Sequence, residues 1–292
     1  MEKKCIEQES LSSARSFKDP PVLSPGVISG FHMQIRGYYK QHRRNFPWRE
    51  TTDPYRILVS EVMLQQTQTS RVEGKYLQFL EAFPDVAALD AAELTSVLRI
   101  WKGLGYNRRA LALKRIAQIV LRDFGGELPQ SLEALLSMPG IGRATAGAIL
   151  AFAFNEPVVF IETNIRRVFL HFFYPDQDAV SDREILPIVE QTLDRDDPRH
   201  WYYALMDYGA MLAKDGLNPN RRSTHYTRQA RFIGSNRQIR GQILQLLLEA
   251  SRFHEKELIE HIGVEAERVR TILAALVEEG FLMREKGELF LR

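Results

Sequence analysis

A turn rich in proline and glycine near the middle of the chain places the strongest constraint on the fold. Pro139, Gly140 and Gly142 favour a tight turn with exposed backbone N–H groups, and a helix predicted from Arg143 points its positive end at the same place. Small residues in this helix allow it to pack closely against helix 132–137 as an antiparallel pair. The sequence therefore predicts a helical hairpin whose turn can bind a phosphate.

The composition is that of an ordinary globular protein. The 292 residues are enough for one large and one small domain, and the net charge of +2 means that any surface for nucleic acid must be a local patch. The single cysteine, Cys5, excludes a disulfide framework and a Cys-ligated zinc or iron–sulfur site within this chain. No apolar run has the length of a membrane span and the start lacks a secretory pattern, so we expect a cytoplasmic protein.

Changes in composition predict four segments. Residues 1–24 are polar and are expected to be disordered. Residues 25–213 carry a series of helix patterns and form the main domain, so the fold class is mainly α. Residues 214–240 contain seven Lys or Arg and one acid, and read as a long basic loop. Residues 241–292 predict three helices and a β-hairpin, which is the pattern of a winged-helix-like (α+β) module.

One helix boundary is predicted from a capping pattern. Residues 90–93 read Asp-Ala-Ala-Glu, which is the form of a capping box. We expect this box to open a helix that ends at Lys102, before the glycines at 103 and 105.

Glu61 stands out within its predicted helix. Asp53 and Pro54 form a good helix start, and the helix is expected to run to about Leu64. Most side chains one turn from Glu61 are apolar, which should raise the pKa of its carboxyl group. Alternatively, Glu61 is a helix-surface glutamate that pairs with Arg56 or Arg71.

Four sequence strings occur in order at family spacing. They are Phe46-Pro-Trp-Arg, Ser60-Glu-Val-Met-Leu-Gln-Gln-Thr-Gln, Trp101-Lys-Gly-Leu-Gly-Tyr and residues 138–146. Together they resemble the MutY adenine DNA glycosylases, members of the helix-hairpin-helix (endonuclease III-like) superfamily, over residues 28–212. The resemblance implies a two-lobed helix-hairpin-helix glycosylase fold and DNA containing a mismatch or a damaged base as the partner. It also implies a monomer associated with the nucleoid.

The resemblance implies chemistry for two carboxyl groups. Family members extrude a nucleotide and cut the bond between base and sugar, here that of adenine mispaired with guanine or 8-oxoguanine. Glu61 matches the catalytic acid, Glu162 stands where the family has an aspartate, and Asn164 matches an asparagine that holds this carboxylate. The start of the next helix should favour the ionised form of Glu162, suited to an oxocarbenium ion. We expect the two carboxyl groups to face one another across a cleft. The alternative for Glu162 is that it only caps the helix.

The resemblance also assigns contacts with DNA. Gln66 and Tyr106 match residues that enter the duplex near the mismatch, with the tyrosine ring stacking on bases. The expected phosphate site at the hairpin consists of Gly140, Gly142, Arg143 and Thr145. Ala144 stands where endonuclease III has a lysine that attacks the sugar, so a monofunctional glycosylase is expected.

The chain departs from the family in two segments. Typical relatives hold a [4Fe–4S] cluster with four cysteines after helix 198–213, where this chain has the basic loop instead. We expect Arg221, Arg222 and Arg231 to contact phosphates without that cluster, unless the loop is a disordered linker. The winged-helix-like module replaces a larger domain similar to MutT. No metal site is expected from the side chains, but the sequence leaves open whether a monovalent cation binds at the hairpin.

Two other functions remain open from the sequence. One is a mismatch glycosylase for another base, such as thymine, uracil or a damaged base, which the glutamate at position 162 favours. The other is a noncatalytic DNA-binding protein on the same scaffold. Retention of Glu61, Gln66 and Tyr106 argues against this second alternative.

Overall fold

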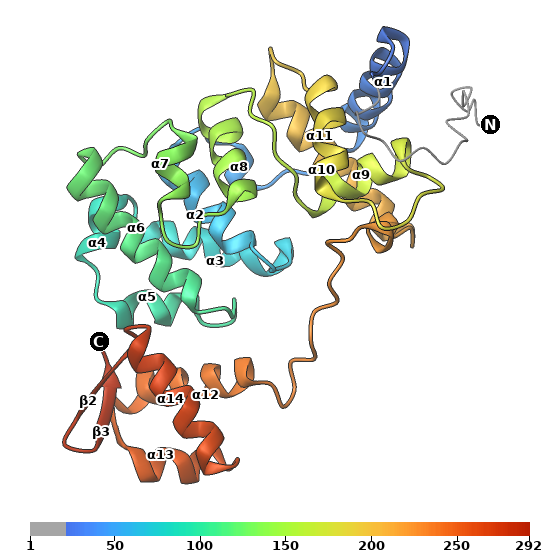
Figure 1. Cartoon of the computed structure of the whole chain (residues 1–292). Helices are drawn as coiled ribbons and strands as arrows, with labels where there is room; N and C mark the ends of the chain where they lie inside the picture. Colours follow the sequence, from blue (N-terminus) through green and yellow to red (C-terminus); the bar gives the residue numbers. More distant parts are fainter. Residues whose placement is uncertain (1–21) are drawn as a thin grey trace. The chain divides into compact units, whose positions relative to one another are not determined.

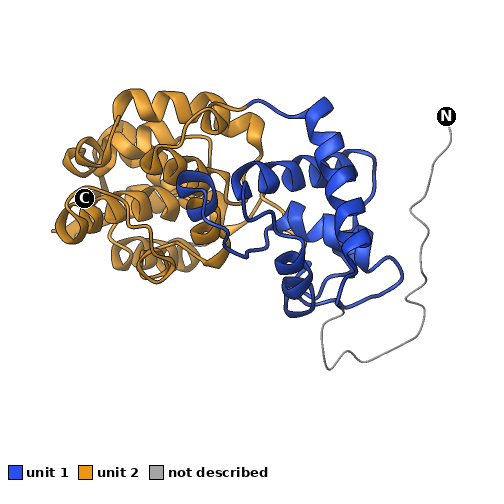
Figure 2. Ribbon diagram, turned by 90° about the horizontal axis from the view of Figure 1, so that it is seen from above, with its two compact units in different colours: residues 1–45, 150–227 blue, residues 46–149, 228–292 orange. Residues whose placement is uncertain are grey.

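The computed structural model describes residues 22–292, which form two compact units (Figure 2). The first unit contains the described residues up to Asn45 together with Leu150–Thr227, and the second contains Phe46–Ile149 and Arg228–Arg292. The predicted disorder of the N-terminal tail falls mostly on residues 1–21, which lie outside the described residues, as does Cys5. Each unit thus combines segments that are far apart in the sequence.

The first unit is a helical bundle around aromatic side chains. Its helices are α1 (Pro25–His42), α9 (Thr163–Phe173), α10 (Asp182–Gln191), α11 (Pro198–Lys214) and the short 3-10 helix η2 (Pro219–Arg222) (Figure 1). Helix α11 packs against both α1 and α9. The ring of Phe31 in α1 is buried, with its centroid 5.2 Å from that of Phe172 and 5.7 Å from that of Trp201. These edge-to-face contacts join the three helices.

The second unit begins with a purely helical part. It consists of η1 (Pro47–Arg49), α2 (Pro54–Leu64), α3 (Thr69–Ala82), α4 (Val86–Ala91), α5 (Leu94–Trp101), α6 (Arg108–Phe124), α7 (Leu132–Leu136) and α8 (Arg143–Phe154), whose residues from Leu150 belong to the first unit. Met63, Phe79, Trp101 and Ile116 are fully buried and bring α2, α3, α5 and α6 together. Each of these helices is amphipathic and turns its apolar face toward this core.

The capping box predicted at residues 90–93 is wrong. Asp90 lies inside α4, which is capped instead by Asp85, whose carboxylate accepts a hydrogen bond from the Ala88 N–H at 2.7 Å. Helix α5 starts after Glu93, whose side chain makes no capping hydrogen bond. An earlier aspartate therefore supplies the cap, and two short helices replace one long helix.

The C-terminal module of the second unit has the predicted winged-helix-like order. Helix α12 (Asn236–Ala250) is followed by β1 (Arg252–His254), α13 (Glu255–Ile262), α14 (Ala266–Glu278), β2 (Leu282–Glu285) and β3 (Glu288–Leu291) (Figure 1). The sheet is antiparallel in the order β1-β3-β2, with Phe253 opposite Leu289 and Met283 opposite Phe290. Strand β1 has three residues and was not predicted, because so short a segment carries no alternation pattern.

Arg108 and Arg115 of α6 attach this module to the rest of the second unit through Glu279. The carboxylate of Glu279 accepts hydrogen bonds from Arg108 of α6 at 2.6 Å and from Arg240 of α12 at 2.6 Å. Arg115 of α6 also donates to the Glu279 carbonyl oxygen at 2.6 Å. These hydrogen bonds lower the pKa of Glu279 to about 2, against the opposing effect of its burial. The module is thus held on α6 by charge-assisted hydrogen bonds.

Among residues 22–292, no helix combines the length and the apolar composition that crossing a bilayer requires.

Candidate functional site

The predicted hairpin is formed by α7, a turn and α8. Gly140 has a φ of +76°, a left-handed conformation that favours glycine, and a Cβ atom there would lie 3.2 Å from the Cβ of Ala112. Gly142 does not use this conformation and has open space around it. Gly140, Gly142 and Arg143 are exposed, with Arg143 in the first turn of α8. This places backbone N–H groups and a positive helix end at the surface, where an anion can reach them.

Gln65 ties this hairpin to the end of α2. Its side-chain amide donates to the Gly140 carbonyl oxygen at 3.2 Å and to the Thr145 hydroxyl at 3.1 Å. The predicted phosphate contact Thr145 is therefore already in a hydrogen bond within the protein. The Met138 carbonyl also accepts from the Ile141 N–H at 3.3 Å, so a cation at the hairpin would share carbonyls that already accept hydrogen bonds.

Glu61 lies in the middle of α2, where the sequence placed it. The Asp53 carboxylate caps this helix by accepting from the Arg56 N–H at 3.1 Å, as expected from the sequence. Glu61 is half-buried, and its helix neighbours Ile57 and Val62 are buried. The carboxyl group of Glu61 therefore lies at the edge of the apolar core of the second unit.

Gln66 and Tyr106 share an unusual backbone conformation. Their φ angles are +53° and +48°, in the left-handed region that side chains other than glycine seldom adopt. Gln66 is exposed and Tyr106 is half-buried. Strained conformations of this kind persist only where the surrounding structure enforces them, and they concentrate at functional sites.

Arg109 holds the backbone next to Gln66 and Tyr106 in place, and this role was not predicted from the sequence. Its guanidinium group is buried and donates six hydrogen bonds, to the carbonyl oxygens of Val62 (3.0 Å), Met63 (2.7 Å), Gln65 (2.7 Å), Leu104 (3.1 Å) and Gly105 (3.0 Å) and to the Thr67 hydroxyl (3.0 Å). Three of these acceptors precede Gln66 and two immediately precede Tyr106. Burial lowers the pKa of Arg109 to about 10. An arginine on the apolar face of the predicted helix was the available sequence signal.

Tyr106 also contacts the segment that leads into the C-terminal module. Its hydroxyl accepts hydrogen bonds from the side chains of Gln229 and Arg237. The Arg237 guanidinium lies 4.9 Å from the centroid of the Tyr106 ring, and the Arg109 guanidinium lies 5.5 Å from it. The predicted duplex-entering tyrosine is therefore flanked by two arginines.

Glu162 in the first unit caps α9. Its Oε1 accepts hydrogen bonds from the backbone N–H groups of Asn164 at 2.7 Å and Ile165 at 2.8 Å. Its Oε2 accepts from the Asn164 side-chain amide at 3.3 Å. Oε1 therefore caps the helix, and Oε2 is oriented by the Asn164 side chain; that Glu162 has a role beyond the cap stays a prediction.

The ionisation of Glu162 is set mainly by burial. Burial raises the pKa of Glu162 above that of an ordinary glutamate, and the hydrogen bonds from Asn164 and Ile165 together with the charges of Arg167 and Arg166 oppose this rise. The N–H groups at the start of α9 favour the carboxylate, as expected from the sequence, but burial acts more strongly in the opposite direction.

Two arginines next to Glu162 have structural partners. Arg167 donates to the Asn164 side-chain oxygen and to the Gly209 carbonyl oxygen, both at 2.7 Å. Arg166 forms a bidentate pair with Asp182 at 2.6 Å. A chain of contacts from α11 through Arg167 and Asn164 therefore reaches the Glu162 carboxylate.

The basic loop is shorter than predicted and contains the short helix η2. It ends at Ser235, whose hydroxyl caps α12 by accepting from the Gln238 N–H at 3.3 Å, so the predicted end at residue 240 is too late. Arg221 and Arg231 are exposed. Arg222 instead donates to the carbonyl oxygens of Leu170 (2.9 Å) and Pro175 at the end of α9. Its guanidinium group is therefore engaged with the protein backbone.

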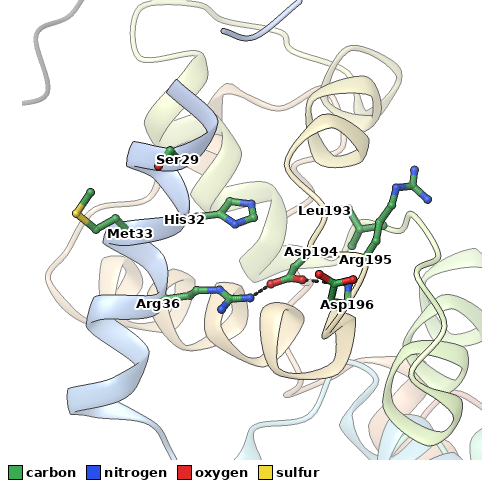
Figure 3. Close-up of a pocket in the computed structure, with 8 residues that line it drawn as sticks. All are labelled: Ser29, His32, Met33, Arg36, Leu193, Asp194, Arg195 and Asp196. Carbon is green, nitrogen blue, oxygen red and sulfur yellow. Dashed lines mark hydrogen bonds and ion pairs between the residues drawn. The ribbon is translucent and has the colours of Figure 1, made fainter. Parts of the chain in front are cut away.

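An open cavity of about 650 Å³ in the first unit contains none of these residues. Arg36 pairs there with Asp194, whose carboxylate also accepts from the Asp196 N–H at 3.1 Å (Figure 3). The ring of His32 is hydrogen-bonded to the Thr192 carbonyl oxygen at 2.8 Å. Arg36, Asp194 and His32 of this cavity are thus engaged with groups of the protein itself.

The predicted site residues fall into two groups. Glu61, Gln66, Tyr106 and the hairpin belong to the second unit, where Gln65 and Arg109 bind them together. Glu162 and Asn164 belong to the first unit. That both carboxyl groups serve one site stays a prediction.

Comparisons with known proteins agree with the resemblance seen in the sequence. Residues 59–190 match the model of the HhH-GPD superfamily base excision DNA repair proteins. The chain is 34% identical over 236 residues to an adenine DNA glycosylase of Mycolicibacterium smegmatis, covering 75% of this chain and 80% of that protein. It is similar to the structure of a thermostable thymine-DNA glycosylase, with a TM-score of 0.58, 26% identity and coverage of 64% and 88%.

A second structural likeness concerns the fold alone. A trapped endonuclease III–DNA covalent intermediate matches with a TM-score of 0.56 and 18% identity, over 65% of this chain and 88% of that chain. The predicted mainly α, endonuclease III-like fold is therefore confirmed.

Proposed function

The chain belongs to the HhH-GPD superfamily of base excision DNA repair proteins, and we propose that it hydrolyses the N-glycosidic bond of adenine mispaired with guanine or 8-oxoguanine. Double-stranded DNA is its partner. The target nucleotide must leave the duplex, because its glycosidic bond is unreachable inside the base stack. The similarity to an adenine DNA glycosylase supports adenine as the target base, and the roles of the residues below are inferred from their surroundings.

One observation in the structure carries this proposal. The hairpin, Gln66 and Tyr106 are joined in the second unit by the hydrogen bonds of Gln65 and Arg109. A phosphate-binding turn and two residues that can enter a duplex are thereby held in fixed relation. A protein that grips the DNA backbone while it opens the stack needs such an arrangement.

Glu61 is proposed as the general acid. Departure of adenine needs a proton on the base, and Glu61 is a half-buried carboxyl group beside the buried side chains of Ile57 and Val62. Glu61→Gln should bind target DNA and release adenine about a hundredfold more slowly, the scale typical of losing acid catalysis. Near-normal turnover would remove Glu61 from the mechanism.

Glu162 is proposed to stabilise the cationic sugar. Its Oε1 serves the helix cap, so Oε2, oriented by Asn164, is the atom available to the oxocarbenium ion. Single-turnover assays of Glu162→Asp and Glu162→Gln test this role. Equal loss in both variants would indicate a site built around glutamate, and full activity of Glu162→Gln would refute the electrostatic role.

Ala144 supports a glycosylase without strand-cleaving activity. Alanine has no amine with which to form a Schiff base with the sugar. Borohydride should therefore trap no covalent complex with DNA. A trapped adduct would contradict this part of the proposal.

The remaining DNA contacts are proposed at backbone phosphates. Gly140, Gly142 and Arg143 offer N–H groups and charge at the hairpin, and Arg221 and Arg231 are exposed in the basic loop. None of these contacts needs a Cys-ligated cluster or a cation. One copy of the chain carries all of them, which supports action as a monomer.

A panel of duplexes tests the proposal directly. Adenine opposite 8-oxoguanine, guanine, cytosine or thymine, and thymine or uracil opposite guanine, are incubated with excess protein and then treated with alkali to break the strand at abasic sites. We expect breaks with adenine opposite guanine and 8-oxoguanine, and none with Glu61→Gln in the same time. Absence of breaks in every duplex would favour a noncatalytic DNA-binding protein.

Removal of thymine or uracil is the second candidate. The likeness to a thymine-DNA glycosylase at 26% identity and the glutamate at position 162 favour it. Breaks confined to thymine or uracil opposite guanine would replace adenine by this substrate.

A further inference from the structure

Five side chains of the second unit alternate between ring and guanidinium. The Arg109 guanidinium lies 5.3 Å from the Trp101 ring centroid and 5.5 Å from that of Tyr106, and the Arg237 guanidinium lies 4.9 Å from Tyr106 and 5.3 Å from Phe232. We call this series the cation–π ladder. Trp101 at its inner end is fully buried, whereas Phe232 at its outer end is 54% exposed. The ladder therefore runs from the core to the surface, with Tyr106 in its middle.

The outer part of the ladder is held in place by a turn. The Phe232 carbonyl oxygen accepts from the N–H of Ser235 at 3.1 Å and from its hydroxyl at 2.6 Å. Gln229 and Arg237, on either side of this turn, both donate to the Tyr106 hydroxyl. The end of the basic loop is thus anchored on the residue predicted to enter the duplex.

The charge around the outer end suits a polyanion. Within the second unit, residues 228–248 contain four arginines and no acidic residue. An exposed aromatic ring beside a guanidinium plane, within a positive surface, is the arrangement that stacks on unpaired nucleobases. Because this segment contains no acidic residue, it has no negative charge that would repel the phosphates on either side of such a base.

We propose that Phe232 and Arg237, together with Tyr106, form a stacking platform for the base left unpaired opposite the extruded nucleotide. This inference rests on the proposed function, because only extrusion leaves a base without its partner. The platform extends the tyrosine outward and gives the protein a contact with the strand that is not cut. The basic loop would then bind a base as well as phosphates.

The test uses a duplex that needs no excision. A tetrahydrofuran abasic analogue is placed opposite 2-aminopurine, whose fluorescence reports stacking, and binding is followed in parallel by anisotropy. The wild-type protein should quench 2-aminopurine on binding. Phe232→Ala should lose most of this quenching and bind about fivefold to a hundredfold more weakly, the range for losing one base–aromatic stack. Arg237→Lys keeps the charge and should lose part of the quenching.

Ile233→Ala is the matched control. Ile233 is adjacent to Phe232, is 86% exposed and lies outside the ladder. The Ile233→Ala variant should quench 2-aminopurine fluorescence and bind the duplex as the wild type does. Equal quenching by the wild type and Phe232→Ala would overturn the platform, and so would a Phe232→Ala variant that changes only the salt dependence of affinity. Unfolding midpoints close to that of the wild type are expected for both variants, because both side chains are exposed.

The two proposals can fail separately. Adenine excision by the wild type is measured on a mispaired duplex in the same buffer. Normal excision without quenching of 2-aminopurine overturns the platform and leaves the proposed function intact. Quenching without excision of any base contradicts the proposed function while the platform still binds an unpaired base.

Discussion

Replacing Arg109 by methionine should destabilise the second unit by about 3 to 5 kcal/mol, the cost typical of breaking a buried charged network. The guanidinium group donates six hydrogen bonds to buried or half-buried acceptors, and each contributes about 1 kcal/mol or more net. Its burial opposes this gain, since lowering the pKa of Arg109 from 12.5 to about 10 corresponds to about 3 kcal/mol. Methionine fills similar space but leaves those carbonyl groups without a donor.

Urea unfolding followed by far-ultraviolet circular dichroism measures this loss. Arg122→Met is the control, because Arg122 lies on the same helix and its exposed pair with Asp123 should contribute little to stability. Arg109→Lys has three donors for six acceptors and should fall between the wild type and Arg109→Met. A loss for Arg109→Met no larger than for Arg122→Met would refute the reasoning.

Three further predictions concern other contacts. Gly209→Ala should lower the rate of adenine excision more than the affinity for DNA, because a Cβ atom would lie 2.4 Å from the Asn164 carbonyl oxygen. Single-turnover assays measure the rate and anisotropy measures the affinity, and an unchanged rate would contradict the prediction. The hydrogen bonds that lower the pKa of Glu279 to about 2 should contribute about 1 to 2 kcal/mol of stability above about pH 4.5, and this contribution should be lost as the pH falls towards 2. In urea titrations Glu279→Gln should remove this pH dependence, and an unchanged dependence of stability on pH in the variant would argue against it. Arg222→Ala should lower the melting temperature, because its guanidinium group is bonded to the protein backbone. Arg221→Ala should leave the melting temperature unchanged but weaken DNA binding and flatten its salt dependence, and the opposite pattern would make Arg222 the DNA contact and Arg221 the structural residue.

Helix positions were largely predictable because helix signals are local. Asp53 and Pro54 act within one turn of the helix that they open, and the sequence placed that helix correctly. The error at residues 90–93 has the same origin. Two aspartates, Asp85 and Asp90, could each start a helix, and packing of α4 against α6 favours the earlier one.

The helical hairpin, the helix positions of Glu61 and Glu162, and the family could be predicted from the sequence alone, because they depend on residue types at short spacings. Tertiary structure decided what these residues touch. Arg109 joins two loops about forty residues apart, and Arg237 reaches Tyr106 from a segment more than a hundred residues further along the chain. Hydrogen bonds of this kind follow from packing geometry, which no local pattern encodes.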